Sequence, residues 1–166
     1  MPIKSLKKGR IRGALQDGNR EFISLLACVN ATGQRLSPGL IYCSESGDIQ
    51  ESWLEDFNTQ EISQRAYFAT SATGWTSDIH GLSWLERFDQ ETKPIASNGT
   101  QKRLLIIDGH SSHITETFIN TAIDRNILIV VFPPYCTHRL QPLNISVFGP
   151  LAAAYSKGLN EHIFAS

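Results

Sequence analysis

Apolar residues in the first third of the chain occur in short runs that predict two strands. One run covers residues 22–29, the turn-prone stretch 30–33 follows it, and a second run covers residues 40–42 beyond Pro38 and Gly39. Short apolar runs separated by turn-forming residues are typical of a hairpin. We therefore expect two paired strands here.

The middle of the chain carries large apolar residues at helical spacing. They form two groups: Trp53, Leu54 and Phe57, and then Leu82, Trp84, Leu85 and Phe88. This spacing predicts helices with one buried face. A tryptophan in basic surroundings suits base stacking, but these stand among acidic residues. We therefore interpret them as core residues.

The clearest pattern lies between residues 103 and 134. An apolar run ends at Asp108 and Gly109, a helical pattern continues through Phe118, Ile119, Ala122 and Ile123, and a second apolar run covers residues 127–132. Ser112 or Thr115 is suited to cap that helix, and Asn126 suits a left-handed residue at its end. A strand, helix and strand in about 30 residues predict a parallel unit whose strands are covered by helices.

A last helix is expected to begin near Pro150, because proline suits a first helical position. Its apolar positions, Leu151, Ala154, Tyr155 and Leu159, are predicted to face inward. The order of strands and helices indicates an α/β fold.

Composition limits the classes of protein. The chain has 166 residues, 41% of them hydrophobic, which suits one domain, and a net charge of −1. Its three cysteines, Cys28, Cys43 and Cys136, form neither a disulfide framework nor a four-cysteine zinc site. No apolar run approaches the roughly 20 residues needed to cross a bilayer. We expect a soluble protein of a reducing, intracellular compartment.

Asp108 is the leading candidate for chemistry, because ligands bind at the carboxyl ends of strands in open α/β sheets. Gly109 behind it would let a backbone or substrate approach closely. The alternative is structural, with Asp108 capping the following turn.

The surrounding residues carry a family resemblance. Residues 108–113 read Asp-Gly-His-Ser-Ser-His, residues 137–144 read Thr-His-Arg-Leu-Gln-Pro-Leu-Asn, and residues 147–150 read Val-Phe-Gly-Pro. These strings resemble the signatures of the DDE superfamily endonuclease domain of pogo, Tigger and jerky-type transposases. Shorter matches at residues 18–22 and 74–85 extend the resemblance to about residues 13–154.

The resemblance implies a ribonuclease-H-like mixed sheet flanked by helices. It also implies metal-dependent phosphodiester cleavage and strand transfer, with three carboxylates around two Mg or Mn ions. Asp108 falls on the second of these acids and would be a metal ligand. The third falls on Asn144, a degenerate position, because an amide oxygen ligates metal without bringing charge. Nothing in residues 1–20 resembles the string of the first acid.

From this we expect a partial catalytic core at residues 14–166 that lacks its first strand and the DNA-binding region usually preceding it. We also expect no metal-dependent cleavage. Residues that would line the site are Gly109, His110, His113 and His138. For His110 and His113 a zinc site is the alternative, but no further Cys or His pair completes a tetrahedron, so structural hydrogen bonding is favoured. For His138 a loop position with satisfied hydrogen bonds is equally open.

Residues 1–13 form a basic arm, predicted to be disordered. Its cations, Lys4, Lys7, Lys8, Arg10 and Arg12, suit phosphate contacts with DNA or a nuclear import signal, and a solvated tail is the alternative. DNA is therefore the expected partner, the nucleus the expected location, and no membrane is expected to be involved.

Three other interpretations stay open. Ser111 with His138 or His162 resembles the nucleophile elbow of a hydrolase, although His113 replaces the closing glycine. A former transposase core could serve as a non-enzymatic nucleic-acid or protein interaction module. The chain could also be a transposon remnant without a role. A missing strand would leave an unpaired sheet edge open to self-association.

Overall fold

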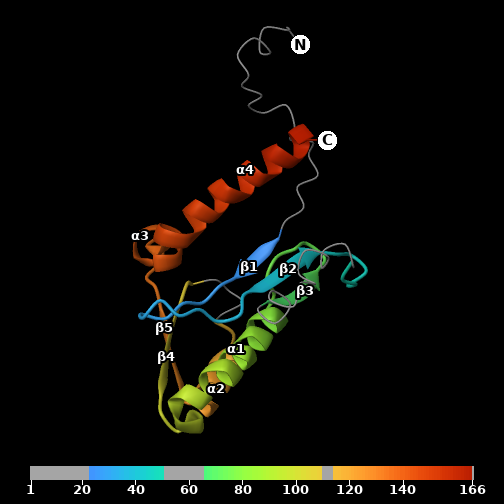
Figure 1. The fold of residues 1–166 in the computed structure, drawn as a ribbon. Coiled ribbons are helices and arrows are strands. Elements are labelled where there is room, and N and C mark those ends of the chain that lie inside the picture. The colour runs from blue at the N-terminus through green and yellow to red at the C-terminus, as the bar shows by residue number, and fades with distance from the viewer. Residues whose placement is uncertain (1–22, 51–65, 110–113, 166) are drawn as a thin grey trace.

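The computed structural model describes residues 23–50, 66–109 and 114–165. Three strands are followed by a mixture of helices and strands, so the predicted α/β class is confirmed (Figure 1). The predicted helix around Trp53, Leu54 and Phe57 lies outside these residues, and so does the whole basic arm.

The predicted hairpin is confirmed. Strand β1 (Ser24–Leu26) pairs antiparallel with β2 (Gly39–Cys43), and the Asn30 N–H donates to the Gln34 carbonyl oxygen at 2.9 Å in the turn between them. Gly33 in that turn has a φ of +83°, which glycine adopts without steric cost. Strand β3 (Tyr67–Ser71) then joins β2 in parallel, which makes a mixed sheet of order β1-β2-β3.

Helix α1 (Asp78–Thr92) buries the face that its sequence spacing predicts. Its start is fixed by a capping arrangement in which the Ser77 N–H donates to His80 Nδ1 at 3.2 Å. Trp84, Leu85 and Phe88 point into the core, and the rings of Trp84 and Phe88 stack with centroids 5.8 Å apart. A 3-10 segment, η4 (Pro94–Gly99), follows the helix.

The predicted strand–helix–strand unit is also confirmed. Strand β4 (Arg103–Ile107), helix α2 (Glu116–Asp124) and strand β5 (Ile127–Val131) follow in order, and the strands pair in parallel. The Thr115 side chain caps α2 by accepting from the Phe118 N–H at 3.2 Å, and Asn126 has a φ of +56°. Both features are as predicted.

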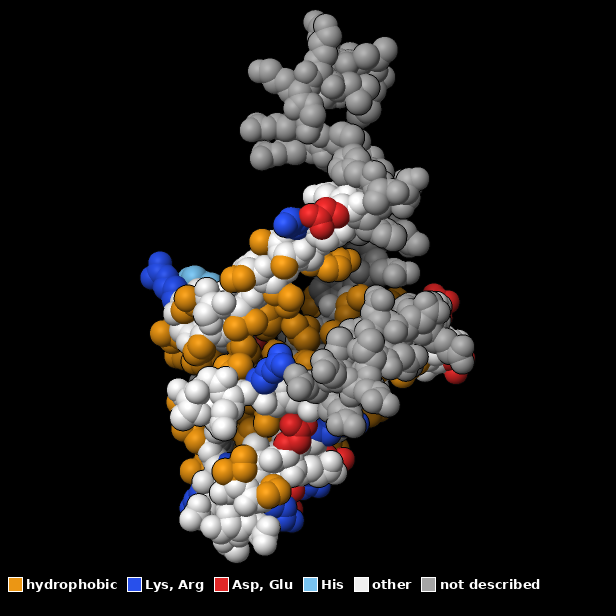
Figure 2. Space-filling view, in the orientation of Figure 1, with side chains coloured by type: hydrophobic (Ala, Val, Ile, Leu, Met, Phe, Trp, Pro, Cys, Tyr) orange, Lys and Arg blue, Asp and Glu red, His pale blue; other side chains and the backbone are white. Residues whose placement is uncertain are grey.

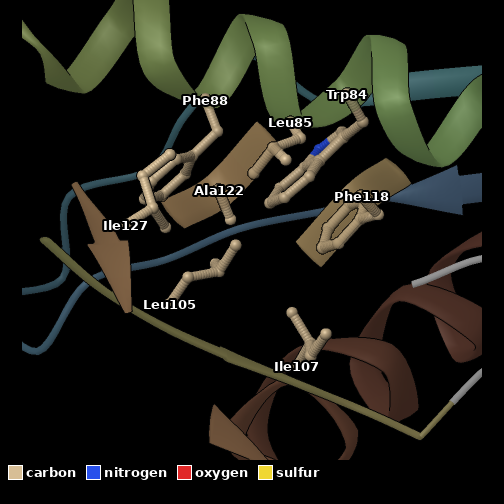
Figure 3. Close-up of a cluster of buried hydrophobic side chains, with 8 residues drawn as sticks. All are labelled: Trp84, Leu85, Phe88, Leu105, Ile107, Phe118, Ala122 and Ile127. Atoms are coloured by element: carbon tan, nitrogen blue, oxygen red, sulfur yellow. The ribbon is translucent and has the colours of Figure 1, made fainter. Parts of the chain in front are cut away.

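The core lies between this unit and helix α1, as Figure 3 shows. Its buried side chains come from α1, β4, α2 and β5: Trp84, Leu85, Phe88, Leu105, Ile107, Phe118, Ala122 and Ile127. The packing of these elements fixes the position of the carboxyl ends of β4 and β5.

The opposite face of β4 and β5 is bare, so the prediction that helices cover these strands holds for one face only. Leu104, Ile106, Leu128 and Val130, called here the bare face, are 47–60% exposed. Residues alternate between the two faces of a strand. Helices α1 and α2 both pack on the side of Leu105 and Ile107, where the buried core side chains lie.

The predicted inward face of the last helix is wrong. Helix α4 (Gly149–Ala165) begins beside Pro150 as expected, but it extends away from the core and above the hairpin (Figure 1). Leu151, Ala154 and Tyr155 are exposed, while the side chain of Leu159 lies outside the description. The helix is joined to β5 through the short helix α3 (Thr137–Leu140) and a π-helical turn, η6 (Asn144–Phe148), and it contacts mainly that turn.

The described strands form two sheets where one mixed sheet was expected. Strands β1, β2 and β3 make the first sheet, and β4 with β5 make the second. Among the described residues no strand connects β1 to β4, so both lie at sheet edges. The mixed strand directions agree with the prediction, whereas the continuity of the sheet does not.

Candidate functional site

Asp108 lies at the carboxyl edge of the β4–β5 sheet. It directly follows Ile107, which pairs with Val131 in the parallel register, and the Phe132 N–H donates to the Ile107 carbonyl oxygen at 3.0 Å. The loop after β5 therefore leaves the sheet beside Asp108. Asp108 is half-buried, and Gly109 after it is exposed.

Packing around Gly109 does not demand a glycine. A Cβ added there would meet Val131 Cγ1 at 3.8 Å, an ordinary van der Waals distance. The packing of the protein itself therefore does not require a glycine here. The close approach predicted at Gly109 would have to be that of a bound molecule.

Asn144 is held in the η6 turn by its own amide. Its Nδ2 donates to Gln141 Oε1 at 2.6 Å and to the Thr137 carbonyl oxygen at 3.3 Å. A carboxylate has no proton to donate to these acceptors. Both hydrogen bonds hold the turn that joins α3 to η6, and they depend on the amide. Asn144 itself is exposed.

His138 lies in α3 and is exposed, as is Arg139 beside it. His110 and His113 lie outside the described residues, and so do Ser111 and the cations Lys4, Lys7, Lys8, Arg10 and Arg12. The side chain of His162 is likewise not described. The structure thus brings Asp108 and the loop after β5 to one edge of the sheet. The roles predicted for the undescribed residues stay predictions.

The described donors do not fit a pair of divalent metal ions. Within residues 23–50, 66–109 and 114–165, no three His, Cys, Asp or Glu side chains are grouped so that they could hold a metal. Mg and Mn favour several oxygen ligands with negative charge. Of the two positions that the resemblance assigns to metal ligands, Asp108 is a carboxylate and Asn144 is a neutral amide.

One surface residue of this edge was missed by sequence reasoning. Residues Pro133 to Cys136 form a turn closed by the Cys136 N–H donating to the Pro133 carbonyl oxygen at 3.2 Å. Tyr135, at its third position, has a φ of +60° and is 94% exposed. Turns with positive φ at that position favour glycine or asparagine. The Pro-Pro pair signals a turn, but the tyrosine gives no sign of the left-handed backbone.

A buried ion pair was missed as well. Arg103 at the start of β4 binds Asp89 of α1, with Nη1 and Oδ1 2.7 Å apart. Arg103 Nη1 also donates to Thr92 Oγ1 at 3.1 Å, and its Nη2 donates to the Arg125 carbonyl oxygen. These contacts tie α1 to the start of β4, at the end of the strand opposite Asp108.

Comparison with known proteins identifies the family. Residues 19–166 match the DDE superfamily endonuclease family, and the chain belongs to it. The resemblance found in the sequence is thereby confirmed at the level of the superfamily, and it is consistent with the pogo and Tigger type.

Among curated proteins, the MFS-type transporter clz9 of Cochliobolus lunatus is 35% identical over 153 residues. The match covers 92% of this chain and 16% of that protein, so the chain spans about a sixth of its relative. Helices in the described part of the chain are too short or too polar to cross a membrane. No solved structure matches the chain.

Proposed function

We propose that this chain is a transposase-derived, endonuclease-like domain that binds nucleic acid and no longer cleaves it. Membership of the DDE superfamily endonuclease family supports the first part. The observation that carries the second part is Asn144, at the position of the family's third acid, with its amide used as a hydrogen-bond donor.

The physical reason is the charge of the site. Paired Mg or Mn ions, when bound, supply a polarised water and stabilise the leaving oxygen at a phosphodiester. In this chain Asp108 would be one ligand, and Asn144 would offer an oxygen without charge. The loss of one full negative charge among the ligands weakens the attraction of the site for divalent ions.

The decisive experiment is a nicking assay on supercoiled DNA with Mg or Mn, comparing the chain with Asp108→Ala and Asn144→Asp variants. We expect no turnover above background from the chain or from Asp108→Ala. Turnover by the unmodified chain that Asp108→Ala abolishes would overturn the proposal. If the Asn144→Asp variant cleaves DNA and the unmodified chain does not, the missing carboxylate at position 144 is the reason for inactivity.

The fold we propose is ribonuclease-H-like. The mixed directions of β1, β2 and β3 and the parallel β4–β5 unit with α1 and α2 on one face support it. An experimentally determined structure of the chain bound to DNA would test this, and a sheet arrangement that cannot be superposed on that fold would refute it.

Nucleic-acid binding is proposed to rest partly on the basic arm. Phosphate contacts release counterions, so the binding constant should fall steeply with salt. A titration of labelled duplex DNA at several salt concentrations tests this, with neutral replacements at Lys4, Lys7 and Lys8 expected to flatten the dependence. Absence of binding at low salt would exclude the nucleic-acid role.

The proposed location is the nucleus, with the same arm as import signal. A fluorescent-protein fusion should accumulate in nuclei, and replacement of Lys4, Lys7 and Lys8 should disperse it. A fusion that is distributed identically in both forms would contradict the assignment.

A protein-interaction role is the second candidate, and the bare face favours it. Parallel sheets are normally covered on both faces, whereas Leu104, Ile106, Leu128 and Val130 are half-exposed. Self-association through this face would cover them, and pairing at the edges of β1 and β4 is a second route to an assembly. Sedimentation velocity at increasing concentration distinguishes a monomer from an assembly.

A further inference from the structure

The turn after β5 presents an aromatic ring to solvent at the edge that carries Asp108. We propose that Tyr135 is a stacking platform for an unpaired base of single-stranded DNA, with Arg139 holding the adjacent phosphate. This inference rests on the proposed nucleic-acid function and deepens it by naming where an unpaired base would bind.

The position of Tyr135 follows from the strand register. Phe132 is hydrogen-bonded to Ile107, the residue before Asp108, at 3.0 Å. Tyr135 is three residues further along, and a chain of three residues spans at most about 10 Å. A base stacked on Tyr135 would therefore bind at the same edge of the sheet as Asp108.

The turn keeps the ring away from the core. Tyr135 is 94% exposed, and its backbone is left-handed, with a φ of +60°, at a position where glycine would be unstrained. The ring makes no contribution to the core described above. Among the described residues, this solvated ring on a strained backbone has no packing role. Base stacking uses such an exposed ring, whatever the identity of the base.

Arg139 supplies the charge that such a site needs. It lies in α3, four residues after Tyr135, is exposed, and forms no ion pair with any described residue. In Figure 2 a positively charged side chain and a histidine project from the end of the molecule where α3 lies. A guanidinium and an aromatic ring four residues apart match the alternation of phosphate and base along a single strand.

The test uses the full chain and a fluorescein-labelled thymidine oligonucleotide of about 16 nucleotides, with binding measured by fluorescence anisotropy at about 50 mM salt. Tyr135→Ala should weaken binding by about 5- to 100-fold, and Tyr135→Phe should bind like the unmodified chain. Arg139→Gln should weaken binding and lower the slope of its salt dependence by about one. Tyr155→Ala, at a 67% exposed tyrosine on α4, is the matched control and should bind unchanged.

The outcomes separate this inference from the function on which it rests. Binding by the unmodified chain that Tyr135→Ala leaves intact overturns the stacking site and leaves the nucleic-acid function standing. Equal losses in Tyr135→Ala and Tyr155→Ala also overturn it, because the effect would not be specific to the loop. No binding of either single-stranded or duplex DNA by the unmodified chain overturns both. Circular dichroism of each variant excludes unfolding as the cause.

Discussion

Arg103 and Asp89 form a buried ion pair, with Nη1 and Oδ1 2.7 Å apart and side chains 8% and 12% exposed. The pair joins the first residue of β4 to the last turns of α1. It thereby holds helix α1 against strand β4, which Asp108 directly follows. Removing Asp89 would leave the buried Arg103 guanidinium without a counter-charge, and removing Arg103 would leave Asp89 with only the longer contact to Arg125 at 4.0 Å.

We predict that Asp89→Asn or Arg103→Met lowers the free energy of unfolding by about 3–5 kcal/mol. Urea denaturation measures this. Glu86→Gln is the control, since Glu86 binds Arg125 at the surface at 3.2 Å and such pairs contribute about 0–1 kcal/mol. Equal, small effects of all three substitutions would show that the pair does not anchor β4.

Substitutions at neighbouring residues of β4 are predicted to change stability by very different amounts. Leu105→Ala should cost about 2–5 kcal/mol because Leu105 is buried in the core. Ile106→Thr should change stability by less than about 1 kcal/mol, because Ile106 is half-exposed on the bare face. The same Ile106→Thr chain should self-associate less in sedimentation velocity. A large loss of stability from Ile106→Thr would mean that the bare face is covered in solution.

The protein is predicted to lose stability above pH 9. Burial, with a smaller contribution from the negative charge of Glu91, raises the pKa of the Cys28 thiol from 9.0 to about 11. Burial also raises the pKa of Tyr67. A pKa raised by folding stabilises the folded state below the unfolded pKa, and this stabilisation disappears as pH rises through the folded value.

Thermal unfolding between pH 8 and pH 11 tests this, with the melting temperature expected to fall. Cys28→Ser removes one titrating group and should make the fall shallower. At pH 8, alkylation of exposed Cys43 should precede that of Cys28. Faster modification of Cys28 would contradict the burial that raises its pKa.

Tyr135→Gly is predicted to keep or raise the free energy of unfolding, by up to about 1 kcal/mol. A left-handed backbone costs a non-glycine residue about 1–2 kcal/mol, and the greater freedom of unfolded glycine offsets part of the gain. Tyr135→Ala keeps the strained backbone and should show no gain. Destabilisation of both variants in urea would show that the ring packs in solution.

Much of the fold follows from local patterns in the sequence. The hairpin, helix α1, the strand–helix–strand unit, the Thr115 cap and the left-handed Asn126 were all predictable, because periodicity and turn residues act over a few neighbouring positions. The two family signatures likewise identified the superfamily through Asp108 and residues 137–144. The start of helix α4 near Pro150 was predictable for the same reason.

Features that depend on distant residues were not predictable. Arg103 and Asp89 are 14 positions apart, and neither spacing nor residue type marks them as partners. The sequence of β4 does not reveal that Leu104 and Ile106 are exposed, because an apolar strand has the same pattern whether one face or both are covered. For the same reason, the apolar positions of α4 gave a wrong prediction of an inward face.

By itself, the sequence determined the superfamily, the order of the elements and the identity of the residue at position 144, since each is written in contiguous motifs or local periodicity. Only the tertiary structure decided where Asp108 lies relative to the Tyr135 loop, which β4 side chains are exposed, and what the Asn144 amide binds. Those relationships depend on strand register and on the packing of elements far apart in the chain, and these emerge only when the chain folds.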